Sequence, residues 1–137
     1  MAQFDHEKLD VYGVAIDFVV LANDVAELLP RGRAYVADQL QRAGISILLN
    51  VAEGAGEFSS KEKARFYRIA KRSATECAAI LDVCSRLELV EKGCLDTGRE
   101  LLLRIVSMLT QMVRLREKSG TGTGTGSGTR EAQPRGN

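Results

Sequence analysis

The 137-residue chain has little of what enzymes commonly use for catalysis. It contains no tryptophan, three cysteines and a single histidine, His6, close to its start. A di-iron centre in a helical bundle requires inward carboxylates with Glu-x-x-His pairs, which one histidine cannot supply. Cys94 has no histidine near it in sequence, and the serines have no evident base to activate them. We therefore expect no metal, cofactor, catalytic residue or small-molecule substrate, and expect the protein not to be an enzyme.

The chain also lacks an excess of charge of either sign. Of its 19 basic and 18 acidic residues, Arg130, Arg135 and Glu131 lie beyond Lys118, so residues 1–118 carry seventeen of each and are formally neutral. A protein that binds nucleic acid through a globally basic surface is therefore not indicated.

A long uninterrupted apolar run is missing as well. The most apolar early segment, residues 11–29, contains four polar side chains, and no basic region or cleavage signal precedes it. We expect no signal peptide and no membrane span. Cys77 and Cys84 are about 10 Å apart along one predicted helix, too far to form a disulfide. Reduced thiols in a bacterial-type cytoplasm are the simplest interpretation.

What the sequence does contain is helical periodicity. Apolar residues recur at helical spacing in four blocks, and no segment shows strand-like alternation. From Ser119 a repeated Gly-Thr pattern predicts a flexible tail over residues 119–137. The predicted fold is all-α, an up-down-up-down antiparallel four-helix bundle over residues 1–118, because short connections favour antiparallel neighbours.

Prolines, glycines and helix-capping residues predict where each helix begins and ends. Pro30 is expected to end the first helix, and Gly54 with Gly56 the second. The Ser-x-x-Glu pattern around Ser59 predicts a third helix beginning near Ser60. Gly93 is expected to end the third helix, and Thr97 to cap the fourth.

The first and fourth helices are too apolar for a solitary bundle. Fifteen of the residues 9–29 are apolar, where a one-sided helix of that length needs roughly nine. Residues 101–115 show a similar excess, and an exposed aliphatic side chain forfeits about 1.5–3 kcal/mol. We predict a homo-oligomer packed through these two helices, with a monomer of apolar surface as the alternative.

The third helix carries a concentrated positive charge on one side. Lys61, Arg65, Arg68 and Arg72 fall within a stripe about 60° wide, opposite an apolar face. Such a stripe could follow a phosphate backbone, with Tyr67 stacking on a base. It could also be a solvated face that pairs with the acidic row Asp10, Asp17 and Asp24 of a neighbouring subunit. The neutral body favours the second interpretation.

The second helix carries a narrow line of short polar side chains. Such groups suit close contact between helices, and we interpret the line as a structural hydrogen-bond network rather than a ligand site. Asn50 is expected to reach Ser73 or Glu76 on the third helix, and Arg42 to pair with a carboxylate. The members of this structural signature are Gln39, Arg42, Ser46, Asn50, Glu53, Ser73 and Glu76.

The residues of this structural signature, together with Gly54 and the segment 66–70, also form a pattern that resembles a known family. As a joint pattern covering about residues 4–117, the sequence resembles the "four helix bundle protein" family. Its first described members are encoded in intervening sequences of bacterial 23S (large-subunit) ribosomal RNA genes. The resemblance implies a bundle that assembles into a ring, commonly a pentamer. It also implies a relationship to the accessory protein of diversity-generating retroelements, which binds a reverse transcriptase and nucleic acid.

Two functions follow as expectations. The first is a non-enzymatic, homo-oligomeric scaffold or interaction protein whose partners are other copies of itself and a further protein. The alternative is an accessory protein that binds RNA or DNA, or assists a nucleic-acid enzyme such as a reverse transcriptase, through Lys61, Arg65, Arg68 and Arg72.

Overall fold

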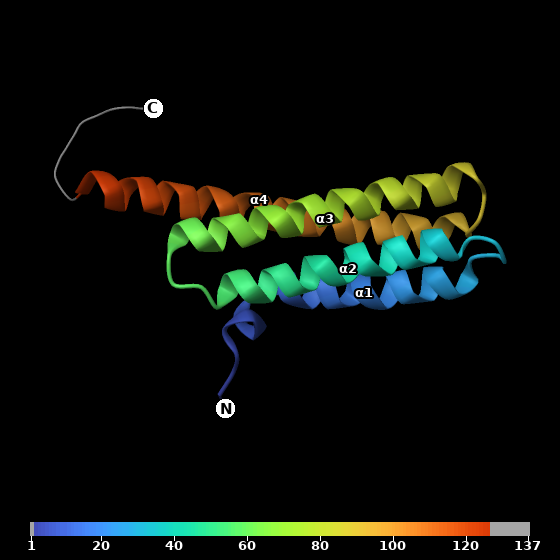
Figure 1. Cartoon of the computed structure of the whole chain (residues 1–137), viewed down its shortest axis with the longest axis horizontal. Helices are drawn as coiled ribbons and strands as arrows, with labels where there is room; N and C mark the ends of the chain where they lie inside the picture. Colours follow the sequence, from blue (N-terminus) through green and yellow to red (C-terminus); the bar gives the residue numbers. More distant parts are fainter. Residues whose placement is uncertain (1, 127–137) are drawn as a thin grey trace.

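Four long helices make up most of the described chain. The computed structural model describes residues 2–126, with side chains up to Lys118. A short 3-10 helix, η1 (Asp5–Lys8), precedes α1 (Asp10–Leu28), α2 (Ala34–Ala55), α3 (Ser60–Arg86) and α4 (Lys92–Gly126). Residues 2–126 contain no strand. Successive helices run in opposite directions (Figure 1), so the predicted all-α four-helix bundle is confirmed.

The helices occupy the corners of a square. Each packs on the next in sequence, and α4 closes the bundle against α1. Within the described helices, no close backbone contact joins α1 to α3 or α2 to α4, so these pairs lie on the two diagonals. Figure 1 shows α4 extending past the start of α3 at the end where η1 also lies.

The core runs along the whole bundle and takes side chains from all four helices. At Gly98 on α4, a Cβ atom would lie 2.9 Å from the side chains of both Leu21 and Leu81. The missing side chain there lets α4 approach α1 and α3 closely. The largest fully buried aliphatic and aromatic side chains are Phe18, Leu40, Ile47, Tyr67, Ile105 and Leu109.

The predicted start of α3 is correct. Ser59 is the N-cap, and its hydroxyl accepts a hydrogen bond from the Glu62 backbone N–H at 3.0 Å. This contact satisfies one of the amide groups that the first helical turn leaves without an intrahelical partner. The ends of α1 and α2 also agree with the expected boundaries, because α1 stops before Pro30 and Gly56 follows α2. Gly54, the other glycine expected there, lies within the last turn of α2.

The predicted connection between α3 and α4 is wrong. Helix α3 ends at Arg86 because Glu88 adopts a left-handed conformation with φ of 55°. The Leu89 N–H then bonds the Cys84 carbonyl at 2.9 Å, the contact of a Schellman C-cap. Helix α4 already begins at Lys92, so Gly93, Cys94 and Thr97 lie inside it.

The Thr97 hydroxyl therefore caps nothing. It donates to the Gly93 carbonyl within the same helix at 3.1 Å. At the other end, α4 includes the first part of the predicted tail, as far as Gly126. Residues 127–137, the rest of that tail, lie outside the described residues. None of the described helices is long and apolar enough to cross a membrane.

Candidate interaction surfaces

A line of hydrogen bonds joins α2 to α3. The Ser46 and Ser73 hydroxyls lie 2.8 Å apart, and Gln39 Nε2 donates to a Glu76 carboxylate oxygen at 2.7 Å. Ser73, at 7% exposure, is the one serine, threonine, amide or charged side chain among the buried residues described. Asn50 Nδ2 donates to the Ser46 carbonyl at 2.8 Å and lies 3.2 Å from its hydroxyl. The hydroxyl pair therefore satisfies a polar group in the core that would otherwise be costly to bury.

Three members of the predicted signature do not cross to α3. Asn50 bonds within α2 and reaches neither Ser73 nor Glu76 directly. Arg42 and Glu53 are exposed, and in the described part of the chain Arg42 makes no ion pair within 4.0 Å. The expected Arg42–carboxylate pair is therefore not formed among residues 2–118.

The basic stripe of α3, formed by Lys61, Arg65, Arg68 and Arg72, is exposed along its length. Two of its members have acidic partners. Arg65 Nε lies 3.0 Å from Glu62 and its guanidinium lies 4.4 Å from the centre of the Phe66 ring. Arg68 bonds Glu117 of α4 at 2.8 Å.

The Arg68–Glu117 pair crosses 49 residues of sequence, so periodicity within one helix gives no signal for it. Lys61 and Arg72 make no ion pair within the described residues. The stripe is thus partly neutralised inside one copy of the chain.

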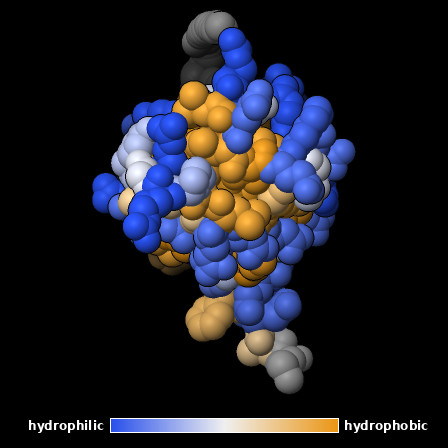
Figure 2. Space-filling model, turned by 90° about the vertical axis from the view of Figure 1, so that its right-hand side faces the viewer, coloured by the Kyte–Doolittle hydropathy of each residue, from blue (hydrophilic) through white to orange (hydrophobic). Residues whose placement is uncertain are grey.

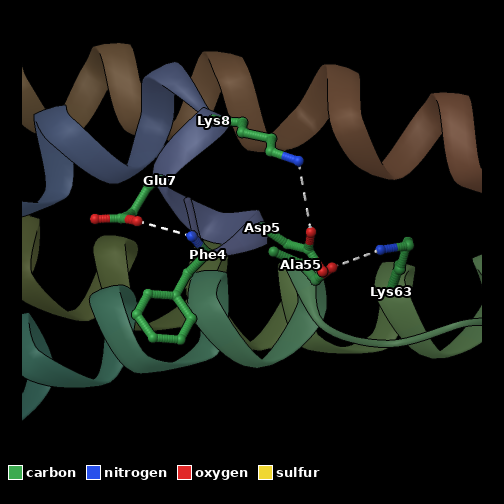
Figure 3. A network of polar contacts seen from close by, with 6 residues as sticks. All are labelled: Phe4, Asp5, Glu7, Lys8, Ala55 and Lys63. Carbon is green, nitrogen blue, oxygen red and sulfur yellow. Dashed lines mark hydrogen bonds and ion pairs between the residues drawn. The ribbon is translucent and has the colours of Figure 1, made fainter. Parts of the chain in front are cut away.

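Lys63, a neighbour of the stripe in sequence, turns inward instead. Its ammonium group donates to the Gly54 carbonyl at 3.2 Å and to the Ala55 carbonyl at 2.9 Å, at the end of α2. Figure 3 shows the bond to Ala55. A cation at a helix C-terminus interacts favourably with the carbonyl ends there. Burial and the nearby Arg116 lower the pKa of Lys63. Lys63 therefore holds the α2–α3 corner and is not available to an external ligand.

Tyr67 cannot stack on a base, contrary to one sequence expectation. Its side chain is 2% exposed and its ring packs against Gly54. Burial raises the pKa of the Tyr67 hydroxyl. The helical projection placed it beside the stripe, but the ring reaches back into the corner between α2 and α3. The described stripe therefore offers cations without an exposed tyrosine among them.

A groove runs along the outside of the bundle between α1 and α4. Large apolar side chains stand exposed on both helices, with Val20 57% exposed on α1 and Leu103 57% exposed on α4. The groove is open to solvent and contains charged as well as apolar groups. Its lining residues are Asp10, Gly13, Val14, Asp17, Leu103, Arg104, Ser107 and Met108.

A second apolar area covers one end of the bundle. Figure 2 looks at the end that carries the α1–α2 and α3–α4 connections and shows apolar atoms gathered at its centre. Leu28, the last residue of α1, and Leu87, the C-cap of α3, are 61% and 48% exposed.

Among the described residues, no group of three or more histidine, cysteine or acidic side chains is placed to hold a metal ion. His6 lies in η1 between the rings of Phe4 and Tyr12, at centroid distances of 5.6 and 4.5 Å. Burial raises the pKa of the Cys77 thiol to about 12, so this thiol is protonated and poorly nucleophilic near neutral pH. Cys94 lies within α4 rather than in a loop, and burial raises its pKa as well.

The fold and its surfaces define the class of the protein as an all-α four-helix bundle. A family model, "23S rRNA-intervening sequence protein", matches residues 7–111, which is more than half of the chain. The protein belongs to this family, as the resemblance of its sequence predicts.

A crystal structure from Bacteroides thetaiotaomicron has the same fold. It is described as a protein with unknown function from the S23 ribosomal protein family. The TM-score is 0.70 at 20% sequence identity, and the match covers 75% of this chain and 97% of that chain. No curated protein matches the sequence.

Proposed function

We propose that the protein is a homo-oligomeric, non-enzymatic scaffold that binds partners through the outer faces of its bundle. The observation that carries the proposal is the groove between α1 and α4, which is lined by exposed Leu103, together with Val20, which is also exposed on α1. Large apolar side chains beside an open groove are typical of surfaces that another protein covers. The family resemblance implies a pentameric ring as the assembly.

Sedimentation of the purified chain at micromolar concentration tests this proposal. The wild type is expected to sediment as an oligomer, and the measured mass gives the number of copies. The variant Val20→Gln/Leu103→Gln is expected to lose mass, because it removes exposed apolar area from the outer faces of α1 and α4. Leu49→Gln serves as a control, because Leu49 is 55% exposed on α2, away from the groove. A wild-type monomer would overturn the proposal.

Nucleic-acid binding is the second candidate. It is supported by the exposure of Lys61, Arg65, Arg68 and Arg72 on one face of α3. Two observations count against it: Arg65 and Arg68 already pair with carboxylates, and Tyr67 is buried. The first candidate is therefore the better supported of the two.

Binding of a generic single-stranded RNA, measured as a function of salt concentration, separates the candidates. A phosphate-binding stripe predicts affinity that falls steeply with salt and is lost when all four residues become glutamine. A matched control neutralises four exposed arginines elsewhere, namely Arg31, Arg42, Arg99 and Arg114. Equal losses in both variants, or no binding at about 50 mM salt, would exclude a specific role for the stripe.

A further inference from the structure

Three aspartates on α1 have no ion-pair partner among the described residues. Asp10, Asp17 and Asp24 are all exposed, and within the described residues none makes an ion pair within 4.0 Å. Arg104 of α4 also lines the groove beside Asp10 and Asp17, but it bonds neither of them. Asp10 and Asp17 therefore place exposed carboxylates in the groove, and Asp24 continues the acidic row along α1.

The spacing of this acidic row matches that of the basic stripe on α3. Asp10, Asp17 and Asp24 are seven residues apart, which places successive carboxylates about 10.5 Å apart along α1. On α3 the same interval of seven separates Arg65 from Arg72, and Lys61 from Arg68. Two helices packed along a seam keep residues at this interval facing each other.

The two charged rows cannot meet within one bundle. Helices α1 and α3 lie on a diagonal and make no close backbone contact. Arg65 and Arg68 have only local or α4 partners, while Lys61 and Arg72 have no ion-pair partner among the described residues. Charge complementarity between the rows can therefore be satisfied only by a second copy.

Gly13 supplies an independent observation at the same place. It is the fourth residue of α1, between Asp10 and Asp17, and it lines the groove. Nothing lies within 4 Å of the position that a Cβ atom would take, so packing within the bundle does not require glycine there. Glycine within a helix is unfavourable, and one use of it is to let another backbone approach closely.

We propose that the α1–α4 groove is the docking site for α3 of a second copy of the chain, with the basic stripe of that copy facing Asp10, Asp17 and Asp24. This inference rests on the proposed homo-oligomer and specifies its contact. The two surfaces lie on different faces of one chain, so the contact is head-to-tail. Repetition of such a contact closes into a ring or continues as a filament.

Charge reversal tests the contact directly. Asp10→Lys/Asp17→Lys and Arg65→Glu/Arg72→Glu each place like charges opposite one another in the contact. Because like charges in contact are strongly unfavourable, each variant is expected to associate at least about tenfold more weakly than wild type. The fourfold variant that carries both reversals restores opposite charges and is expected to regain the wild-type mass. Asp38→Lys/Asp82→Lys, at exposed positions outside both rows, is the control.

Sedimentation and far-ultraviolet circular dichroism are measured on every variant. If a reversed variant loses helicity, Gly13→Gln decides the question, because it keeps all charges and fits the open space over α1. It is expected to remain helical and to lose mass. An oligomer that is unaffected by both reversals and by Gly13→Gln would overturn the proposed contact while leaving the scaffold intact.

Two further outcomes also decide between proposals. A wild-type monomer would overturn both the scaffold and this contact. If Arg65→Glu/Arg72→Glu keeps the wild-type mass but loses binding of single-stranded RNA, the stripe serves RNA and the contact is wrong.

Discussion

At the residue scale, Gly54 sets how closely α2 and α3 approach. A Cβ atom at this position would lie 2.6 Å from Cε1 and 2.9 Å from Cδ1 of Tyr67, and 3.1 Å from the Phe66 Cβ. Tyr67 is almost fully buried, so its ring has no free space into which it could move. The glycine therefore makes room for the largest side chain of the core, and Lys63 bonds the Gly54 carbonyl at the same corner.

Gly54→Ala is expected to destabilise the protein by about 1–3 kcal/mol, the usual cost of overpacking a filled core. The control is Gly56→Ala, because Gly56 has φ of −86° and its Cβ position has ordinary contacts only. That change should be neutral or stabilising by up to about 1 kcal/mol, since it restricts the unfolded chain. Urea unfolding of both variants checks the pair, and equal stabilities would contradict the steric explanation.

Burial of Cys77 predicts a loss of stability at alkaline pH. The pKa of its thiol is raised from 9.0 to about 12, so between these values the unfolded chain loses the proton while the folded chain keeps it. The free energy of unfolding therefore falls as pH rises above about 9, by up to about 1.4 kcal/mol per pH unit for this group. Cys84 and Tyr67, whose pKa values burial also raises, act in the same direction.

Urea unfolding at several values between about pH 8 and pH 10 measures this dependence. Cys77→Ala is expected to be less stable throughout but to show a shallower decline with pH, because one buried thiol is removed. Parallel declines in the two proteins would show that Cys77 does not contribute.

At the scale of elements, a partly buried hydroxyl pair contributes to the contact between α2 and α3. Ser46 and Ser73 satisfy each other at 2.8 Å, and Asn50 supports Ser46 from the next turn of α2. Removing one hydroxyl leaves the other without that partner in a partly buried contact. Removing both leaves no unsatisfied hydroxyl, although it creates a small void.

A double-mutant cycle measures this pairing. Ser46→Ala and Ser73→Ala are each expected to cost about 1–2 kcal/mol, while the double variant should cost less than their sum by about 0.5–1.5 kcal/mol. Thermal or urea unfolding gives all four stabilities. Strictly additive effects would mean that the two hydroxyls do not stabilise the contact between the helices.

The ends of α3 and the start of α4 show which local sequence patterns predict a helix boundary correctly. Ser59 caps α3 as its sequence pattern predicts, because the bond to Glu62 involves only residues three apart. The other end of α3 differs from expectation, because Glu88 takes the left-handed conformation that glycine usually supplies. The Thr97 pattern has the spacing of a capping box but falls within α4, where the hydroxyl bonds its own helix. The same Ser/Thr-x-x-Glu spacing therefore caps a helix at Ser59 but lies inside a helix at Thr97.

At the scale of the whole molecule, self-association should couple to stability. Binding that favours the folded state stabilises it by mass action, so the Tm of an oligomer rises with protein concentration. For the wild type, a hundredfold increase in protein concentration is expected to raise the free energy of unfolding by up to about 2.7 kcal/mol. For a chain of this size, that increase corresponds to a rise in Tm of several degrees.

Differential scanning calorimetry across that range of concentration tests this expectation. The variant Val20→Gln/Leu103→Gln should show a Tm that depends less on concentration, because it associates more weakly. A wild-type Tm that is independent of concentration would contradict the proposed assembly.

The sequence alone determined the four helices, their order and the family. These follow from apolar periodicity, from Ser59, and from a pattern of small and polar residues on the second and third helices, all of which act over short distances along the chain. The polar line that contains Ser46 was also visible, because residues three or four apart share a face of a helix.

Only the tertiary structure decided which side chains of these patterns meet. Tyr67 lies inside and Lys63 turns toward the end of α2, because both fill a corner that exists only once α2 and α3 have packed. Arg68 finds Glu117 across 49 residues for the same reason. The basic stripe and the acidic row were each readable from spacing. Their placement on diagonal helices, which prevents them from pairing within one copy, comes from the packing of the bundle.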